Sequence, residues 1–218
     1  MTLRLFLTIL SLAALAAPVV FAAPALAHPH VWVAAREEIL FDSNGDIAAI
    51  RHIWTFDEMY SAFAVQGLGK DGQPPTREEL APLAKTNVES LADFQYFTAA
   101  KTGPKYHEFG TPTDYSLEAD ASKIVTLRFT LPLKTPVTSK KPFTFIVYDP
   151  TYFVDIELDK QMPVVLKNAP AGCSMSTIKP EPLSASETSK LSESFFSGLS
   201  PGSDFGIKLA TRTLVVCP

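Results

Sequence analysis

The sequence predicts an α+β fold in which β-strands predominate, paired mainly as antiparallel hairpins, with two or three packed helices and one disulfide near the C-terminus. Two alternating apolar runs flank an Asn-Gly pair, which is the strongest short signal of a hairpin. From residue 94 onward, proline and glycine separate short apolar runs, a pattern typical of neighbouring antiparallel strands. Apolar residues at helical spacing are confined to a few segments between residues 57 and 91 and near residue 195.

Length and composition indicate a folded protein with a substantial core. The chain has 218 residues, of which 46% are hydrophobic and 19% charged, and this excludes a disordered chain or a coiled coil. We expect residues 28–218 to form one α+β domain, with two small lobes at 28–100 and 101–218 as the alternative. The formal net charge of −4 argues against a protein that holds nucleic acid through phosphate contacts.

The first 27 residues have the pattern of a secretory signal peptide. A short basic start ending at Arg4 precedes an apolar run, and Ala25-Leu26-Ala27 is a small-x-small cleavage signal. An uncleaved membrane anchor is the alternative, because the apolar run is long enough to span a bilayer. Two prolines in the run and the cleavage signal favour removal. No second run of spanning length follows, so we expect the mature protein to be exported and not to cross a membrane.

The first hairpin joins 31–41 to 47–56 through a predicted type I′ turn, in which Asn44 and Gly45 both have positive φ. Its register places apolar pairs on one face: Val33 with Phe56, Ala35 with Trp54, Ile39 with Ile50, and Phe41 with Ala48. Glu37 and His52 pair in the middle of that face. Glu38 and Arg51 pair on the other face, together with Arg36 opposite Ile53, and we expect this face to meet solvent.

The remaining elements follow the same signals along the chain. Helices are predicted over 57–65 and 76–91, with capping-box spacing at Thr55 and Glu58 and at Thr76 and Glu79. Residues 169–186 are predicted to be a loop with room for one strand, and 191–199 a short helix. The other predicted strands are 94–99, 106–109, 114–118, 124–131, 143–148, 152–158, 164–167 and 209–217.

Cys173 and Cys217 are the two cysteines of the chain. Export to an oxidising compartment favours a disulfide between them, which would attach the last segment to the body of the protein. A metal site with two cysteine ligands is the alternative, but no CxxC spacing supports it.

Removal of residues 1–27 makes His28 the N-terminal residue, followed by Pro29 and His30. The free α-amine and the imidazole of His28 can chelate a metal together, and a second histidine completes the arrangement of histidine-brace copper proteins. The hairpin register brings this terminus near Asp57 and Glu58, so Zn²⁺, Ni²⁺ or Cu²⁺ could bind there. The alternatives are a solvated terminus, and carboxylates that serve only the N-terminus of a helix.

Two further histidines are weaker metal candidates. His52 and Glu37 form either a structural pair inside the apolar face or a second metal position. On an extended strand Glu37 lies roughly 20 Å from His30, so one ion cannot bind to both. His107 has no partner that the sequence identifies.

Signatures of common enzymes are missing from the sequence. It contains no GxSxG, HExxH or P-loop motif. A literal GxGxxG at residues 67–72 lacks the strand–turn–helix unit that a dinucleotide site needs. We therefore expect a protein that is not an enzyme.

Four motifs resemble one bacterial family, filed as domain of unknown function one thousand and seven. They are residues 25–33 (ALAHPHVWV), 54–61 (WTFDEMYS), 148–153 (YDPTYF) and the closing Cys217-Pro218. Members are usually labelled periplasmic components of ABC-type transport systems, encoded beside or fused to nickel/cobalt-type permeases, and some are linked to zinc acquisition. The resemblance implies a periplasmic location, and its motifs map onto His28 and His30 and onto Asp57 and Glu58.

We therefore expect a periplasmic accessory protein that binds Zn²⁺, Ni²⁺ or Co²⁺ and passes the ion to or from an inner-membrane permease or ABC-type transporter. The hairpin-rich pattern differs from the larger two-lobed fold of ordinary ABC solute-binding proteins, so we do not expect capture by closure of two lobes. One alternative is a histidine-brace copper protein, either a chaperone or an oxidase-like enzyme. The other is a structural adaptor of a permease without a metal site.

Overall fold

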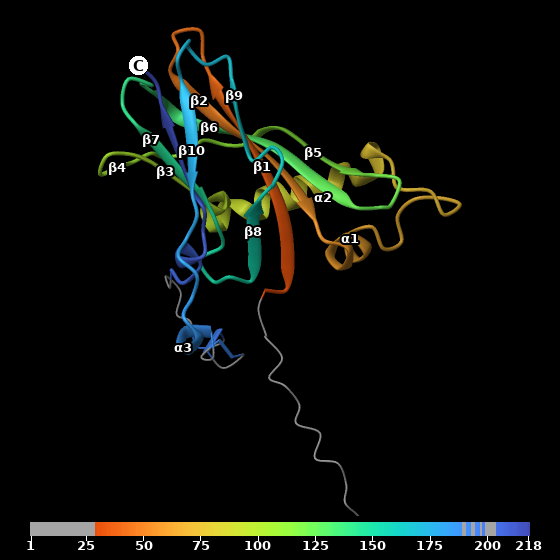
Figure 1. Cartoon of the computed structure of the whole chain (residues 1–218). Helices are drawn as coiled ribbons and strands as arrows, with labels where there is room; N and C mark the ends of the chain where they lie inside the picture. The colour runs from red at the N-terminus through yellow and green to blue at the C-terminus, as the bar shows by residue number, and fades with distance from the viewer. Residues whose placement is uncertain (1–28, 189–190, 193–194, 197, 199–203) are drawn as a thin grey trace, which may run out of the picture.

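Two β-sheets pack face to face in the computed structural model, which describes residues 29–188, 191–192, 195–196, 198 and 204–218 (Figure 1). The predicted signal peptide lies outside the described residues. The larger sheet has the strand order β5-β6-β2-β1-β8, with β9 also paired to β1, and the smaller has the order β10-β11-β7-β3-β4. The strands are β1 (Val31–Phe41), β2 (Ile47–Phe56), β3 (Thr98–Thr102), β4 (Lys105–Tyr106), β5 (Thr113–Ala119), β6 (Val125–Val137), β7 (Phe143–Val147), β8 (Val154–Leu158), β9 (Val164–Lys167), β10 (Ser174–Ile178) and β11 (Arg212–Val216).

The predicted α+β class with dominant antiparallel strands is confirmed. The helices are α1 (Glu58–Ala64), α2 (Arg77–Leu91) and the short α3 (Ala185–Thr188), with 3-10 turns η1 (Ala92–Phe97) and η2 (Gly206–Lys208). Each sheet takes strands from both halves of the chain, and the buried side chains between them form one apolar cluster. The predicted disulfide between Cys173 and Cys217 is present. Among the described residues, no helix has the length and apolar character to cross a membrane.

The register of the first hairpin is confirmed along most of its length. Val33 pairs with Phe56, Ala35 with Trp54, and Glu37 with His52, as the alternation of apolar residues predicts. The turn is different, because Phe41 pairs with Ile47 instead of Ala48 across a bulge.

The carboxylate of Asp42 explains this turn. Its Oδ1 accepts hydrogen bonds from the backbone N–H groups of Asn44 at 2.8 Å and Asp46 at 3.0 Å. Of the two turn residues, only Gly45 has a positive φ, +80°. The predicted type I′ turn is therefore wrong: a side-chain cap holds a longer loop in which Asn44 needs no left-handed conformation.

The outer face of the hairpin is less open to solvent than predicted. Glu38 is almost fully buried there, because three cations surround its carboxylate. They are Arg36 at 3.2 Å, Arg51 at 3.5 Å and Lys167 at 3.6 Å. The expectation of a solvated face is therefore wrong for Glu38.

One edge of β1 is shared by two parallel neighbours, which the hairpin pattern did not predict. Val31–Ala35 pair with β8, and Glu37–Leu40 pair with β9. Between them, the N–H of Asp159 donates to the carbonyl of Ala35 at 2.7 Å. The loop 159–163 thus crosses at the middle of β1, and β8 covers the half of β1 that is nearest the N-terminus (Figure 1).

The helices confirm one predicted cap and correct another. The capping box of α2 forms between Thr76 and Glu79. The cap of α1 is Asp57, whose carboxylate accepts the N–H of Tyr60, so the predicted box at Thr55 and Glu58 is wrong. Residues 92–97, predicted in part as a strand, form η1, and β3 begins only at Thr98 because residues 95–97 have φ between 50° and 56°.

Candidate functional site

The N-terminal end of β1 is anchored to the residue that precedes β8. The N–H of His30 donates to the carbonyl of Phe153 at 2.9 Å, and the two rings lie 4.8 Å apart between centroids. His30 is exposed, whereas His28, the other predicted ligand of the terminus, lies outside the described residues. The terminus of β1 therefore leaves the sheet beside β8, at the lower end of the view in Figure 1.

A turn capped by Asp149 places Phe153 at this position. Asp149 is buried, and its Oδ1 accepts both the N–H and the hydroxyl of Thr151 at 2.8 Å. Its Oδ2 accepts the N–H of Val154 at 2.9 Å, so the carboxylate fixes the start of β8. Tyr152 within the turn has a φ of 59°, a left-handed conformation that these hydrogen bonds support.

Asp57 fastens the hairpin to α1. Its Oδ1 accepts the N–H of Tyr60 at 2.9 Å, and its Oδ2 accepts the N–H of Trp32 at 2.8 Å. The contact is reciprocal, since the N–H of Asp57 also donates to the carbonyl of Trp32 at 3.0 Å. Asp57 thus has the structural role of a helix cap, and each oxygen keeps a second lone pair. Glu58, in the first turn of α1, is exposed.

An acidic cavity of about 510 Å³ lies beside this end of β1. Its lining comes from the start of β1, the end of β2, β8 and the loop after β8. Four carboxylates contribute to it, from Asp57, Asp155, Glu157 and Asp159, together with the side chains of Trp32 and Lys160. Parallel pairing puts Asp155 opposite Trp32 and Glu157 opposite Ala34.

The surroundings of Asp155 on β8 raise its affinity for protons. Burial raises the pKa of Asp155 above its usual value, and the neighbouring charge of Glu157 raises it further, while a hydrogen bond from Tyr152 lowers it. Burial and the charge of Asp155 raise the pKa of Tyr152 to about 12. The pKa of Asp159 is lowered instead, because the N–H groups of Met162 and Gln161 donate to its carboxylate. A cation bound in the cavity would relieve the repulsion between Asp155 and Glu157.

Sequence reasoning missed Asp155 and Glu157. The signal was present in the alternation of residues 154–158, VDIEL, which places two carboxylates on one face of a predicted strand. What was missing was the parallel pairing of β8 with β1, which brings that face beside the N-terminus. Within the part of the chain that the structure describes, no group of three or more His, Cys, Asp or Glu side chains is close enough to hold a metal ion.

Glu37 and His52 form a buried pair between the two sheets, separate from the terminus. Both side chains are fully buried, and Oε2 of Glu37 lies 2.6 Å from Nδ1 of His52. The other carboxylate oxygen accepts the indole N–H of Trp54 at 3.1 Å. On its far side, Nε2 of His52 lies 3.5 Å from the hydroxyl of Thr98 in the opposite sheet, and its ring stacks on Phe129. These contacts are those of a structural pair in the core.

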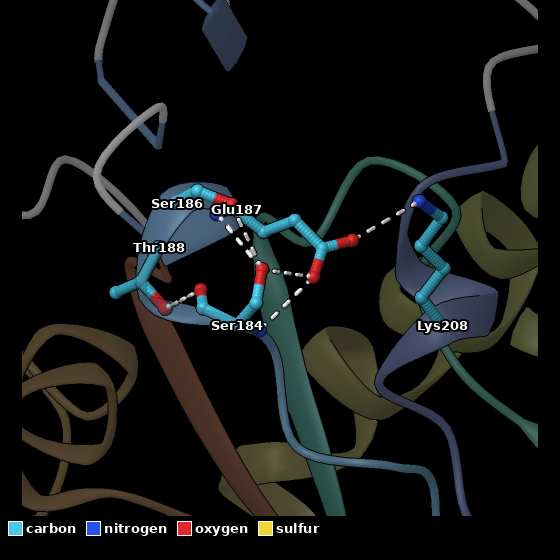
Figure 2. A network of polar contacts seen from close by, with 5 residues as sticks. All are labelled: Ser184, Ser186, Glu187, Thr188 and Lys208. Atoms are coloured by element: carbon cyan, nitrogen blue, oxygen red, sulfur yellow. Dashed lines mark hydrogen bonds and ion pairs between the residues drawn. The ribbon is translucent and has the colours of Figure 1, made fainter.

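The remaining polar groups that the sequence or structure brings forward have local roles. His107 contacts the hydroxyl of Thr102 through Nε2 at 2.9 Å and follows β4 of the smaller sheet, whereas His30 precedes β1 of the larger one. Figure 2 shows Ser184 and Glu187 in a reciprocal helix cap at the start of α3, with Lys208 reaching Glu187 at 3.8 Å. This exposed serine cluster caps a helix and ties α3 to η2.

The chain is similar to a described protein family and to a curated bacterial protein. The family described as "Protein of unknown function (DUF1007)" matches residues 13–217. An uncharacterised 15.5 kDa protein from the trpE 3′ region of Spirochaeta aurantia is 36% identical over 95 residues, which is 44% of this chain and 67% of that protein.

Proposed function

This chain belongs to the family described as "Protein of unknown function (DUF1007)", and from that premise we propose that it is a periplasmic, non-enzymatic protein that binds a divalent transition metal. The ion is Zn²⁺, Ni²⁺ or Co²⁺, and it passes to or from an inner-membrane permease or ABC-type transporter. The observation that carries the proposal is the anchoring of His30 to Phe153, beside an acidic cavity.

The proposed site combines the new N-terminus with the carboxylates of β8. Removal of residues 1–27 leaves the α-amine and imidazole of His28 two residues ahead of His30. Nitrogen ligands suit Zn²⁺, Ni²⁺ and Co²⁺, and the carboxylates of Asp155 and Glu157 supply negative charge that attracts a cation. Because the amine and imidazoles must be deprotonated to bind, uptake of the metal releases protons.

An exposed apolar face on α1 supports a role beside a protein partner. Met59 and Phe63 are 65% and 75% exposed and lie four residues apart, on one side of the helix. Asp57, which caps this helix, also binds the backbone of β1. A permease that covered α1 would therefore sit next to the proposed metal site, as a transfer of the ion requires.

Calorimetric titration of the processed protein, starting at His28, tests the proposal with each metal chloride in turn. A variant with one alanine ahead of His28 moves the α-amine away from the imidazole, and we expect its metal affinity to fall at least about tenfold. His30→Ala should have a comparable effect. The matched control is His107→Ala, which removes the histidine that follows β4 of the smaller sheet and should leave the affinity unchanged.

Three outcomes separate the alternatives. Equal affinities of the processed and extended proteins would exclude the N-terminal site. Exclusive binding of Cu²⁺, with nitrogen hyperfine structure in its EPR spectrum, would favour the histidine-brace copper protein. Unchanged metal-dependent growth after replacement of both His28 and His30 would leave the adaptor role, for which Met59 and Phe63 offer the docking surface.

A further inference from the structure

A second cavity, of about 630 Å³, lies between the turn of the β3–β4 hairpin and the end of β6. This hairpin projects from one side of the molecule (Figure 1). One wall is the turn and second strand of that hairpin, up to His107. The other wall is the end of β6 and the loop that leads to β7. One backbone hydrogen bond joins the two walls, from the N–H of Lys134 to the carbonyl of Glu108 at 2.9 Å, and another, from the N–H of His107 to the carbonyl of Ala100 at 2.9 Å, holds His107 against β3.

The charge of this cavity is opposite to that of the first. Lys105 and Lys141 stand on opposite walls, and no aspartate or glutamate belongs to the lining. Glu108, which directly follows His107 of the lining, is paired with Lys134 at 2.8 Å. In the described part of the chain, neither Lys105 nor Lys141 has a carboxylate within ion-pair distance. The lining thus contains two lysines without a paired carboxylate.

Several side chains of the lining can donate hydrogen bonds. The hydroxyls of Thr102, Thr135 and Thr138 line it, together with the imidazole of His107. Nε2 of His107 is engaged by the hydroxyl of Thr102 at 2.9 Å. If Thr102 donates in that contact, Nδ1 carries the ring proton and can donate to a ligand.

Most of the remaining lining is apolar. Pro104, Pro136 and Pro142 have no N–H, and Val137 is buried behind them. Such a wall suits a hydrocarbon body and not a hydrated inorganic ion. The volume is within the range of small-molecule sites.

From this arrangement we infer that the cavity binds a small organic carboxylate, with the carboxylate between Lys105, Lys141 and His107 and the hydrocarbon body against the prolines. Ammonium groups and a histidine favour a carboxylate through charge-assisted hydrogen bonds. A metal cation is disfavoured by the same two positive charges. The inference is independent of the proposed metal site, which lies at the other cavity.

The charge of Lys105 already acts on the histidine. Burial and this positive charge lower the pKa of His107 from its ordinary value of 6.5. Lys141 faces the same cavity from the β6–β7 loop, and the third titratable side chain of the lining is His107 itself. A bound carboxylate would oppose both lysines and raise the pKa of His107 again.

The test uses the full mature protein and four probes: benzoate, benzamide, acetate and inorganic phosphate. Titration by NMR should show benzoate binding with shifts at His107 and residues 135–142. Benzamide, which has the same ring without the charge, should bind at least about tenfold more weakly, as should acetate and phosphate, which lack the apolar body. Equal binding of benzamide, or phosphate binding as tight as that of benzoate, would overturn the assignment, as would failure of benzoate to bind.

Variants locate the site. Lys105→Gln and Lys141→Gln should each weaken benzoate binding by about tenfold, because each removes one charged donor from an exposed position without changing the core. Lys160→Gln is the matched control, since it removes an equally exposed lysine at the acidic cavity and should change nothing. In saturating benzoate, the midpoint of the pH titration of the His107 ring should lie at a higher pH than in the free protein. Equal effects of all three substitutions, or an unmoved midpoint, would contradict the inference.

Discussion

The buried pair of Glu37 and His52 should be among the most sensitive positions of the fold. Both side chains are completely covered, and Oε2 of Glu37 lies 2.6 Å from Nδ1 of His52. His52→Phe keeps an aromatic ring against Phe129 but leaves the carboxylate of Glu37 with only the indole N–H of Trp54. Because an uncompensated charge then stays buried, we expect the free energy of unfolding to fall by about 3–5 kcal/mol.

The converse substitution should be similarly costly for a different reason. Glu37→Met removes the charge but leaves two buried donors or acceptors, on His52 and Trp54, without partners. Each unsatisfied group costs about 1–3 kcal/mol, so about 2–6 kcal/mol is expected. The double variant loses both ionisable groups, and only the indole N–H remains unsatisfied. Its cost should be about 1–3 kcal/mol, much less than the sum of the single substitutions.

Urea denaturation followed by circular dichroism measures the three free energies and completes a double-mutant cycle. Glu89→Gln, which removes one partner of the exposed pair with Lys85, is the matched control and should have no resolvable effect. Additive effects of the two core substitutions, or single substitutions that each cost less than about 1 kcal/mol, would refute the reasoning. Retained metal binding by the double variant would also show that this pair is not part of the metal site.

Three further predictions follow from contacts described above. Replacement of Cys173 and Cys217 by alanine removes a disulfide that spans 44 residues. The chain-entropy relation gives a fall of about 4 kcal/mol in the free energy of unfolding, which urea denaturation measures. A reduced wild type as stable as the oxidised one would contradict this prediction. Asp57→Ala removes the cap of α1 and should cost about 0.5–2 kcal/mol; an unchanged urea midpoint would contradict its role as a cap. Because the pKa of His107 is lower in the folded state, the unfolded chain binds more protons near pH 6. The free energy of unfolding should therefore fall as the pH drops below about 6.5. His107→Gln should make this dependence on pH less steep.

The register of the first hairpin was predictable because only one alignment gathers most of its apolar residues on the same face. Shifting β1 by one residue would move Ala35 and Ile39 to the outer face and turn the carboxylate of Glu38 toward the apolar core. The turn was not predictable by the same reasoning. Its conformation depends on the side chain of Asp42, whose hydrogen bonds compete with the backbone preference of Asn-Gly.

The acidic cavity was only half predictable. Asp57 was found because it lies at the end of the hairpin, where the pairing with Trp32 extends one step beyond β2. Asp155 and Glu157 were not found, because alternation identifies the two faces of a strand but not its neighbour in the sheet. Residues 94–97 were wrongly predicted as part of a strand for a related reason. An apolar run is compatible with a strand, and the left-handed residues of η1 depend on tertiary packing.

The parallel pairing of β1 with β8 also has a consequence for folding. Val31 and Val154, which are neighbours in the sheet, are separated by about 120 residues of chain, so the entropic cost of bringing them together is high. Contacts of such long range form slowly, and the hairpin of β1 and β2 can close well before β8 reaches it. The residues that are synthesised first would therefore be among the last to gain their final neighbours, and metal affinity, if it depends on β8, should appear only in the final phase of refolding.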